Sequence, residues 1–184
     1  MKISSLALMA LLAISTAAAA EGPKTNPPPS IQLRAFGNFD LKAMNQPQLK
    51  DGAASKAADT LREHFDTTVK PVIDGWKGSS AQPGDRTLNI QPELVEMHFV
   101  GGKARFWAGA FAGNSFVTLR IKLTDAVSGE VIGEPEFFQR ANAVGGAWTV
   151  GKTDKDMLKR VVTLVANYLT SNYDEAIGGP TGRD

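Results

Sequence analysis

Apolar and polar residues alternate most regularly over residues 117–123, where four apolar side chains are separated by polar ones. A period of two predicts a β-strand that buries one of its faces. Shorter or less regular alternation predicts a first strand over residues 31–36 and two more over residues 86–100 and 131–141. The chain therefore contains one block of strands in its middle third, preceded by an isolated strand.

Turn residues divide this block. Ser128 and Gly129 lie in a polar stretch over residues 125–130, which predicts a hairpin turn. Gly133 and Pro135 predict that the strand that follows lies at a sheet edge or contains a bulge. In the strand over residues 86–100 the inward face is predicted to carry the apolar residues Leu88, Ile90, Val95, Met97 and Phe99.

Two other segments show helical spacing. Apolar residues recur at intervals of three and four over residues 53–70, which predicts an amphipathic helix that Pro71 should end or bend. A second apolar stripe follows Thr153, whose hydroxyl could cap a helix together with Asp156. The predicted order is therefore β-α-β-β-β-α. It favours an α+β two-layer sandwich, with a largely antiparallel or mixed sheet and two helices on one face.

The two ends of the chain differ from this folded unit. Residues 1–20 combine Lys2, a short apolar run and small residues before Glu21, which is the layout of a secretory signal peptide cleaved after Ala20. Residues 21–30 are rich in proline and are predicted to form an extended tether. Residues 174–184 are predicted to be a flexible tail. A single envelope domain is expected over residues 31–173.

Composition supports an exported protein without an anchor. The chain has no cysteine, so it lacks disulfides and the thiol that a lipoprotein signal would acylate. The apolar run of the signal is too short to span a bilayer, and no second segment is long enough. Loss of Lys2 with the signal leaves as many basic as acidic residues, so no electrostatic footprint for nucleic acid is present. We expect a periplasmic protein without a transmembrane or lipid anchor.

Candidate catalytic and metal-binding residues are sparse. His98 and Glu96 share a strand face and could bind a metal, with Glu93 or His64 added from elsewhere, but a solvated strand face explains the same pattern. Ser115 lies in a sequence that lacks the second glycine of a hydrolase nucleophile elbow. The sequence therefore predicts no catalytic residue, no metal and no other cofactor.

Two glycine-rich patches are the most unusual stretches. The first, residues 101–114, contains Arg105, Phe106, Trp107 and Phe111, and the second, residues 145–151, contains Trp148. These five residues are the candidates for binding a partner or ligand, because binding groups often collect on loops at one end of a sheet. The alternative is that the aromatic side chains fold back into the core.

Several of these stretches together resemble a family of exported bacterial proteins that is catalogued only as a domain of unknown function. The resemblance rests on residues 88–96, the first glycine-rich patch, residues 117–132 and the last helix. The order of elements is also similar, more loosely, to the periplasmic α/β domains of curli-secretion-type outer-membrane assembly lipoproteins. The resemblance implies a domain that acts through contacts, with no catalytic residues to assign.

Two hypotheses follow. The first is a soluble periplasmic interaction or envelope-assembly accessory module, without enzymatic activity, whose partner is another envelope protein. The alternative is an envelope enzyme or small-ligand-binding protein with a site between the two glycine-rich patches. A pocket in which Trp107 and Trp148 converge with Arg105 or His98 would favour the alternative.

We expect the mature protein to begin at Glu21 and to leave cells on osmotic shock without detergent, because the signal layout predicts cleavage after Ala20. N-terminal sequencing of the released protein checks this. Retention of Met1 in a membrane pellet would contradict both the cleavage site and the location.

Overall fold

The computed structural model describes residues 22–47, 52–77, 86–98, 115–141 and 150–183. Its main sheet is mixed, because one edge strand pairs in parallel with its neighbour and the other pairs are antiparallel. The strands in spatial order are β2 (Asn38–Leu41), β3 (Thr87–His98), β4 (Phe116–Asp125) and, both paired with β4, β5 (Val131–Gly133) and β6 (Glu136–Arg140). The interruption between β5 and β6 contains Pro135, in agreement with the break that the sequence predicts.

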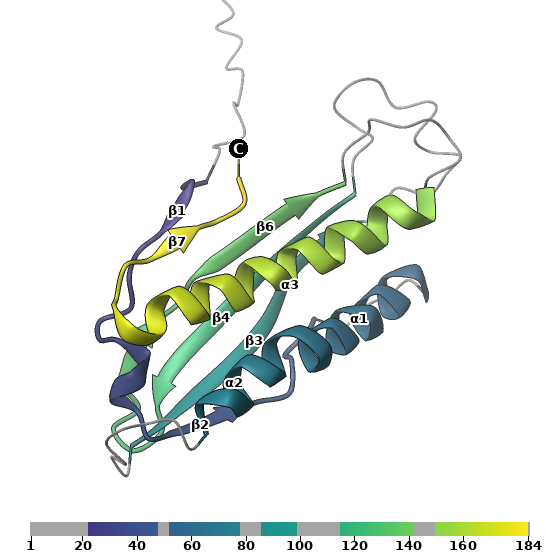
Figure 1. Cartoon of the computed structure of the whole chain (residues 1–184). Helices are drawn as coiled ribbons and strands as arrows, with labels where there is room; N and C mark the ends of the chain where they lie inside the picture. The colour runs from purple at the N-terminus through teal and green to yellow at the C-terminus, as the bar shows by residue number, and fades with distance from the viewer. Residues whose placement is uncertain (1–21, 48–51, 78–85, 99–114, 142–149, 184) are drawn as a thin grey trace, which may run out of the picture.

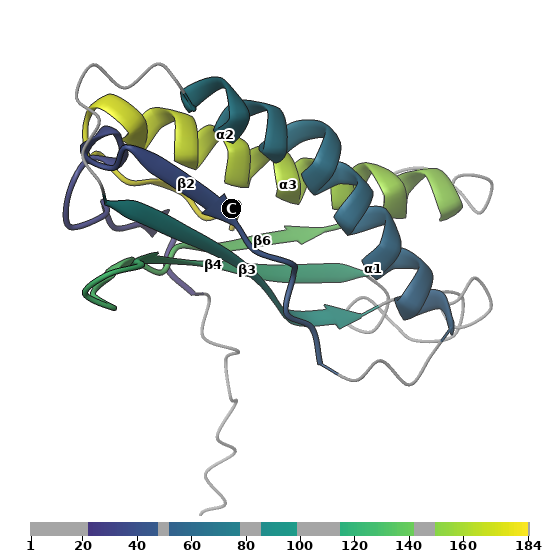
Figure 2. The ribbon, with the colours of Figure 1, turned by 90° about the horizontal axis from the view of Figure 1, so that it is seen from below.

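The helices cover one face of this sheet (Figures 1 and 2). A first helical segment consists of α1 (Gly52–His64), the π-helical η2 (Phe65–Val69) and α2 (Lys70–Trp76), and it lies beside the long helix α3 (Val150–Asp174). The predicted α+β two-layer sandwich with its helices on one sheet face is therefore confirmed. Among the described residues, no helix is both long and apolar enough to cross a bilayer.

The core forms between the helices and the inward rows of β3 and β4. Val117, Leu119, Ile121 and Leu123 are fully buried, as their alternation predicts, whereas Lys122 on the opposite face is substantially exposed. In β3 the prediction fails at Val95, which is 40% exposed. A bulge between Leu94 and Glu96 shifts the register there, so the inward row passes from Leu94 to Met97.

The first predicted strand is wrong. Residues 33–35 form a 3-10 turn, η1 (Leu33–Ala35), and the first strand of the main sheet follows it as β2. Leu33 and Phe36 are three residues apart, and both are fully buried. A turn with three residues per turn directs both into the core, which a strand could not do, because odd spacing sends side chains to opposite faces.

The first helix extends beyond its predicted end. The chain stays helical past Pro71 as far as Trp76, with Pro71 in the first turn of α2. Proline clashes with the carbonyl four residues before it in an α-helix. Here the N–H of Lys70 donates to the carbonyl of Phe65, five residues back, so the turn before Pro71 is wider. The last helix begins at Val150, so Thr153 lies inside it and is not its cap.

The predicted tether and tail are structured where they are described, and they bind to each other. β1 (Thr25–Asn26) pairs with β7 (Gly179–Pro180), and we call this pair the terminal ribbon. Figure 1 shows it beside β6. The side chain of Asn26 donates to the carbonyl of Glu136 and accepts from its N–H, and the N–H of Phe138 donates to Thr181. The ribbon therefore satisfies the outer edge of β6.

Buried polar groups hold the ribbon against α3. Asn172 is fully buried, and its side-chain oxygen accepts from the N–H groups of Ile177 and Gly178, while its amide donates to Tyr168 and Gly178 carbonyls. The hydroxyl of Tyr168 donates to the carbonyl of Pro27 at 2.9 Å, and burial raises the pKa of Tyr168 to about 12. Short proline- and glycine-rich ends are thus ordered by tertiary contacts that composition does not reveal.

The predicted hairpin turn after β4 is confirmed. The carboxylate of Asp125 accepts from the N–H groups of Val127 and Ser128 and pairs with Arg86 at 2.7 Å. These hydrogen bonds, the one from Arg86 above all, lower the pKa of Asp125. Gly129 has a φ of +72°, the left-handed conformation that glycine adopts without strain.

We expect Leu119→Ala to lower the free energy of unfolding by about 2–5 kcal/mol, as for a leucine truncated in a packed core. Lys122→Ala, on the opposite face of β4, is the control and should change it by no more than about 0.5 kcal/mol. Thr118, which the alternation also predicts to be exposed, is buried and is not a control. Urea unfolding of both variants tests the contrast. Equal losses would contradict a sheet that is covered on one face only.

We expect Asn172→Ala to lower the free energy of unfolding by about 2–4 kcal/mol, because it leaves buried N–H groups without an acceptor. Asn167→Ala is the matched control, since Asn167 lies on the same helix with its side chain exposed. Thermal or urea unfolding measures both. A loss at Asn172 no larger than at Asn167 would show that the ribbon adds little to the stability of the domain.

Candidate functional site

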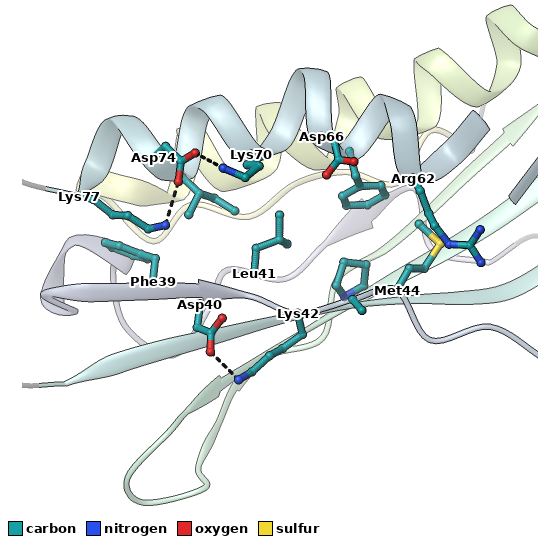
Figure 3. Close-up of a pocket in the computed structure, with 14 residues that line it drawn as sticks. Phe39, Asp40, Leu41, Lys42, Met44, Arg62, Asp66, Lys70, Asp74 and Lys77 are labelled. Atoms are coloured by element: carbon teal, nitrogen blue, oxygen red, sulfur yellow. Dashed lines mark hydrogen bonds and ion pairs between the residues drawn. The ribbon is translucent and has the colours of Figure 1, made fainter. Parts of the chain in front are cut away.

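A groove with a cavity volume of about 380 Å³ lies between the edge strand β2 and the helical segment from α1 to α2. Figure 3 shows side chains from the strand and from the helix facing one another across it. Its apolar lining comes from both sides and from β3: Phe39, Leu41, Met44, Phe65, Ile73 and Pro92. Its polar lining consists of charged residues: Asp40, Lys42, Arg62, Asp66, Lys70, Asp74 and Lys77.

The backbone of β2 presents an unpaired edge to this groove. The N–H of Asn38 donates to the carbonyl of Arg86, just before β3, and the N–H of Lys42 donates to the carbonyl of Ile90 in β3. Because successive N–H groups of a strand point to opposite sides, those of Phe39 and Leu41 point away from the sheet, as do their carbonyls. Neither residue has a hydrogen-bond partner for these groups in the described part of the chain. Each therefore offers one free donor and one free acceptor.

Pro92 explains why β2 is short. In the parallel pairing, the ladder would continue with a bond from residue 92 to the carbonyl of Lys42, but proline has no N–H. The pairing resumes one residue out of register, as a bridge between Asn45 and Glu93. The amide of Gln91 donates to the carbonyl of Ala43 in the gap. The chain after Leu41 therefore leaves the regular strand beside the groove, where Met44 joins the lining.

The π-helical turns build the opposite wall. Phe65, Val69 and Ile73 are buried at a spacing of four, so the adjacent residues Asp66, Lys70 and Asp74 form a parallel row one position further round the helix. π-helical turns within α-helices occur frequently at functional sites. Here the turn brings a row of charges along the side of the helix that faces β2, as Figure 3 shows.

The charges along this wall are not evenly distributed. The carboxylate of Asp74 accepts from Lys70 at 2.5 Å and from Lys77 at 2.8 Å, and these hydrogen bonds, Lys70 first, lower the pKa of Asp74. The bond to Asp74 raises the pKa of Lys70 in turn, so Lys70 stays a cation at neutral pH. We call Lys70, Asp74 and Lys77 the cationic triad, because it carries one excess positive charge. Asp66 supplies a negative charge further along the same wall.

The sequence also singled out five candidate residues for binding a partner or ligand. Arg105, Phe106, Trp107, Phe111 and Trp148 all fall outside the described residues, so their predicted role is untested. The described residues that flank the two glycine-rich patches do lie at one end of the sheet. His98 pairs with Phe116, which pairs with Arg140.

The other candidate groups are accounted for by local contacts. The ring of His98 lies 5.6 Å from that of Phe116, and Ser115 is fully buried. Within the described ranges, no group of three or more His, Asp or Glu side chains could hold a metal ion. Among the described residues that line the groove there is no serine, threonine or histidine, and Lys70 is held as a cation. The groove therefore combines a strand edge with charged and apolar side chains, which are features suited to binding by backbone pairing and charge.

Sequence reasoning missed this groove because no strand was predicted between residues 36 and 53. One signal was present. Phe39 and Leu41 alternate with Asp40 and Lys42, which is the period of a strand.

No model of a protein family matches the chain, and no curated protein matches it either. Solved structures do match in layout. The protein XCC0632 of Xanthomonas campestris, from the family DUF330, is 15% identical, with 83% of this chain and 94% of that one covered and a TM-score of 0.46. The hypothetical protein CT253 of Chlamydia trachomatis is 9% identical, with 74% and 99% covered and a TM-score of 0.41. The PelC dodecamer of Paraburkholderia phytofirmans is 11% identical, with 76% and 95% covered and a TM-score of 0.39.

At these identities and TM-scores the likenesses carry no conclusion about activity. One neighbour is itself catalogued under a domain of unknown function. The resemblance to curli-secretion-type lipoproteins, which none of these three proteins is named for, stays a prediction.

Proposed function

We propose that this protein is an exported interaction module of the cell envelope, which acts by holding a segment of another protein in the groove beside β2. The signal layout of residues 1–20 supports export, and the balanced charge of the remaining chain supports a periplasmic protein that binds proteins and not nucleic acid. The chain would act without catalysis.

The observation that carries this proposal is the free edge of β2. Proteins usually protect an exposed strand edge, because it pairs readily with other chains. In this fold the opposite edge of the sheet is covered by the terminal ribbon, as the bonds to Glu136 and Phe138 show. Within the described ranges nothing pairs with the outer edge of β2, and this edge lies beside an apolar groove with charged walls. An edge left open beside a groove is the arrangement that strand-adding recognition domains use.

Site-specific photo-crosslinking in the native host tests this function. A photo-crosslinking amino acid in place of Ala43, an exposed residue that lines the groove, should give a discrete product with another envelope protein. The control position is Val127, which is 82% exposed on the hairpin away from the groove. Absence of a product at position 43, or an identical product at position 127, would contradict the proposal.

A further inference from the structure

We infer that the groove takes an extended peptide segment that adds to the sheet as a strand antiparallel to β2. This segment presents to the helix wall a basic, an apolar and an acidic residue at alternate positions. The inference rests on the proposed function and names the partner's chemistry. Three properties of the groove lead to it. They are the direction of its free backbone groups, the distribution of its charges and the charge repulsion that a second copy of this chain would meet.

The backbone groups set the mode of binding. Phe39 and Leu41 are two residues apart, so their outward N–H and carbonyl groups lie on one line at the spacing of a β-ladder. An antiparallel segment can bond both residues reciprocally, and antiparallel pairing is the more stable kind per residue. The side chains of Phe39 and Leu41 face the helices, where both line the groove, so alternate side chains of the added strand enter the groove beside them.

The charges set the side chains. In Figure 3, Phe39 lies at the triad end of the groove and Met44 lies at the other end, beside Arg62. The charge of Arg62 is paired with Asp59. The excess positive charge of the triad is complementary to an acidic residue, and Asp66 is complementary to a basic one. Asp66 and Asp74 are eight positions apart on the helix, roughly 12 Å at 1.5 Å per residue. That distance corresponds to about four residues of an extended strand.

The spacing gives a pattern. A basic and an acidic residue four positions apart in a strand point to the same side, and the residue midway between them points there too. That middle side chain would contact the apolar lining formed by Leu41 and Ile73. Because an antiparallel segment ends near Phe39, its acidic residue follows its basic one. The pattern is therefore Lys or Arg, any residue, an apolar residue, any residue, then Asp or Glu.

A second copy of this chain is a poorer occupant. Antiparallel pairing of two β2 edges through the same backbone groups would place Phe39 opposite Leu41 and Asp40 opposite Asp40 of the other copy. Like charges directly opposite each other destabilise a strand pair. The Asp40 carboxylate is partly neutralised at 2.5 Å by Lys42, the residue that follows β2, yet both side chains remain exposed. Pairing of β2 with β2 of a second copy is therefore less favourable than pairing with a segment that carries a different charge opposite Asp40.

Fluorescence anisotropy with defined peptides tests the inference on the full mature chain. The probe is the labelled, end-capped heptapeptide Thr-Lys-Thr-Val-Thr-Glu-Thr, and the control exchanges its Lys and Glu. We expect the probe to bind more tightly than the exchanged peptide by roughly tenfold, from two charge pairs at a partly desolvated surface. The double variant Lys70→Glu and Lys77→Glu should reverse this preference. Equal binding of the two peptides to the unmodified chain would overturn the inference.

Backbone pairing has its own matched variants. Leu41→Pro removes the outward N–H and keeps the bonds to β3, whereas Leu41→Ala removes a similar amount of side chain and keeps that N–H. Relative to Leu41→Ala, Leu41→Pro should weaken binding of the probe about five- to tenfold, the effect of one lost hydrogen bond. If Leu41→Pro unfolds, a probe methylated on its backbone nitrogens replaces it and should fail to bind the unmodified chain. Equal binding in either comparison would overturn strand addition.

Two further outcomes separate this inference from the proposed function. If Leu41→Pro leaves the crosslink at position 43 unchanged in cells, a protein still occupies the groove and strand addition is wrong. If sedimentation shows a dimer that Leu41→Pro abolishes, the occupant is a second copy and the inference is likewise wrong.

Discussion

The parallel pairing of β2 with β3 is the constraint on which the rest of the structure depends. Parallel neighbours cannot be joined by a tight turn, so the chain between them must cross over the sheet, usually as a helix. Here the crossover contains α1, η2 and α2 and lies beside α3 over the inward rows of the sheet. Trp76 stacks on Tyr173 at 4.6 Å and contacts Phe39 at 5.1 Å, so one aromatic cluster joins α2, α3 and β2. The groove exists because the crossover helix lies next to β2, the edge strand of the sheet.

The outer N–H and carbonyl groups of the two edge strands are treated differently in this fold. At β6, the side-chain amide of Asn26 makes the two hydrogen bonds that a neighbouring strand would make: it donates to the carbonyl of Glu136 and accepts from its N–H. The ribbon that carries it is held by close contacts, since a side chain on Gly178 or Gly182 would collide with backbone oxygens of Asn26 or Phe138. At β2, charged side chains stand beside the edge and leave its hydrogen-bonding groups open. One edge is covered by the terminal ribbon, whereas among the described residues the other edge has charged side chains beside it and no pairing strand.

The sequence predicts those parts of the fold that depend on local periodicity. The strand around Leu119 and the helix around Leu61 are long enough for a period to stand out, and both are present. Leu33 and Phe36 were misassigned because six residues do not distinguish alternation from a turn with period three. The order of the terminal ribbon depends on partners more than a hundred positions away, such as Glu136 for Asn26, and composition near a chain end carries no record of them.

The candidate site was still harder to predict, because none of its features is local. Whether Phe39 and Leu41 have free N–H groups depends on which strand lies on their other side, and the shortness of β2 depends on Pro92, a residue of its neighbour. The row of Asp66, Lys70 and Asp74 is visible as a spacing of four, but only the packing of the helix shows that it faces a strand edge. The sequence shows which residues are present, but it does not show that they lie close together in the fold.

The asymmetry between the two edges also limits how large an assembly can grow through strand pairing. A sheet with two open edges can propagate, since every added chain presents a new edge to the next one. In the described part of this chain the ribbon seals one side, so pairing at β2 would join two bodies and then stop. A complex formed through this edge would have a one-to-one stoichiometry. The terminal ribbon, which covers the other edge, would prevent further strand pairing and so prevent growth into a fibre.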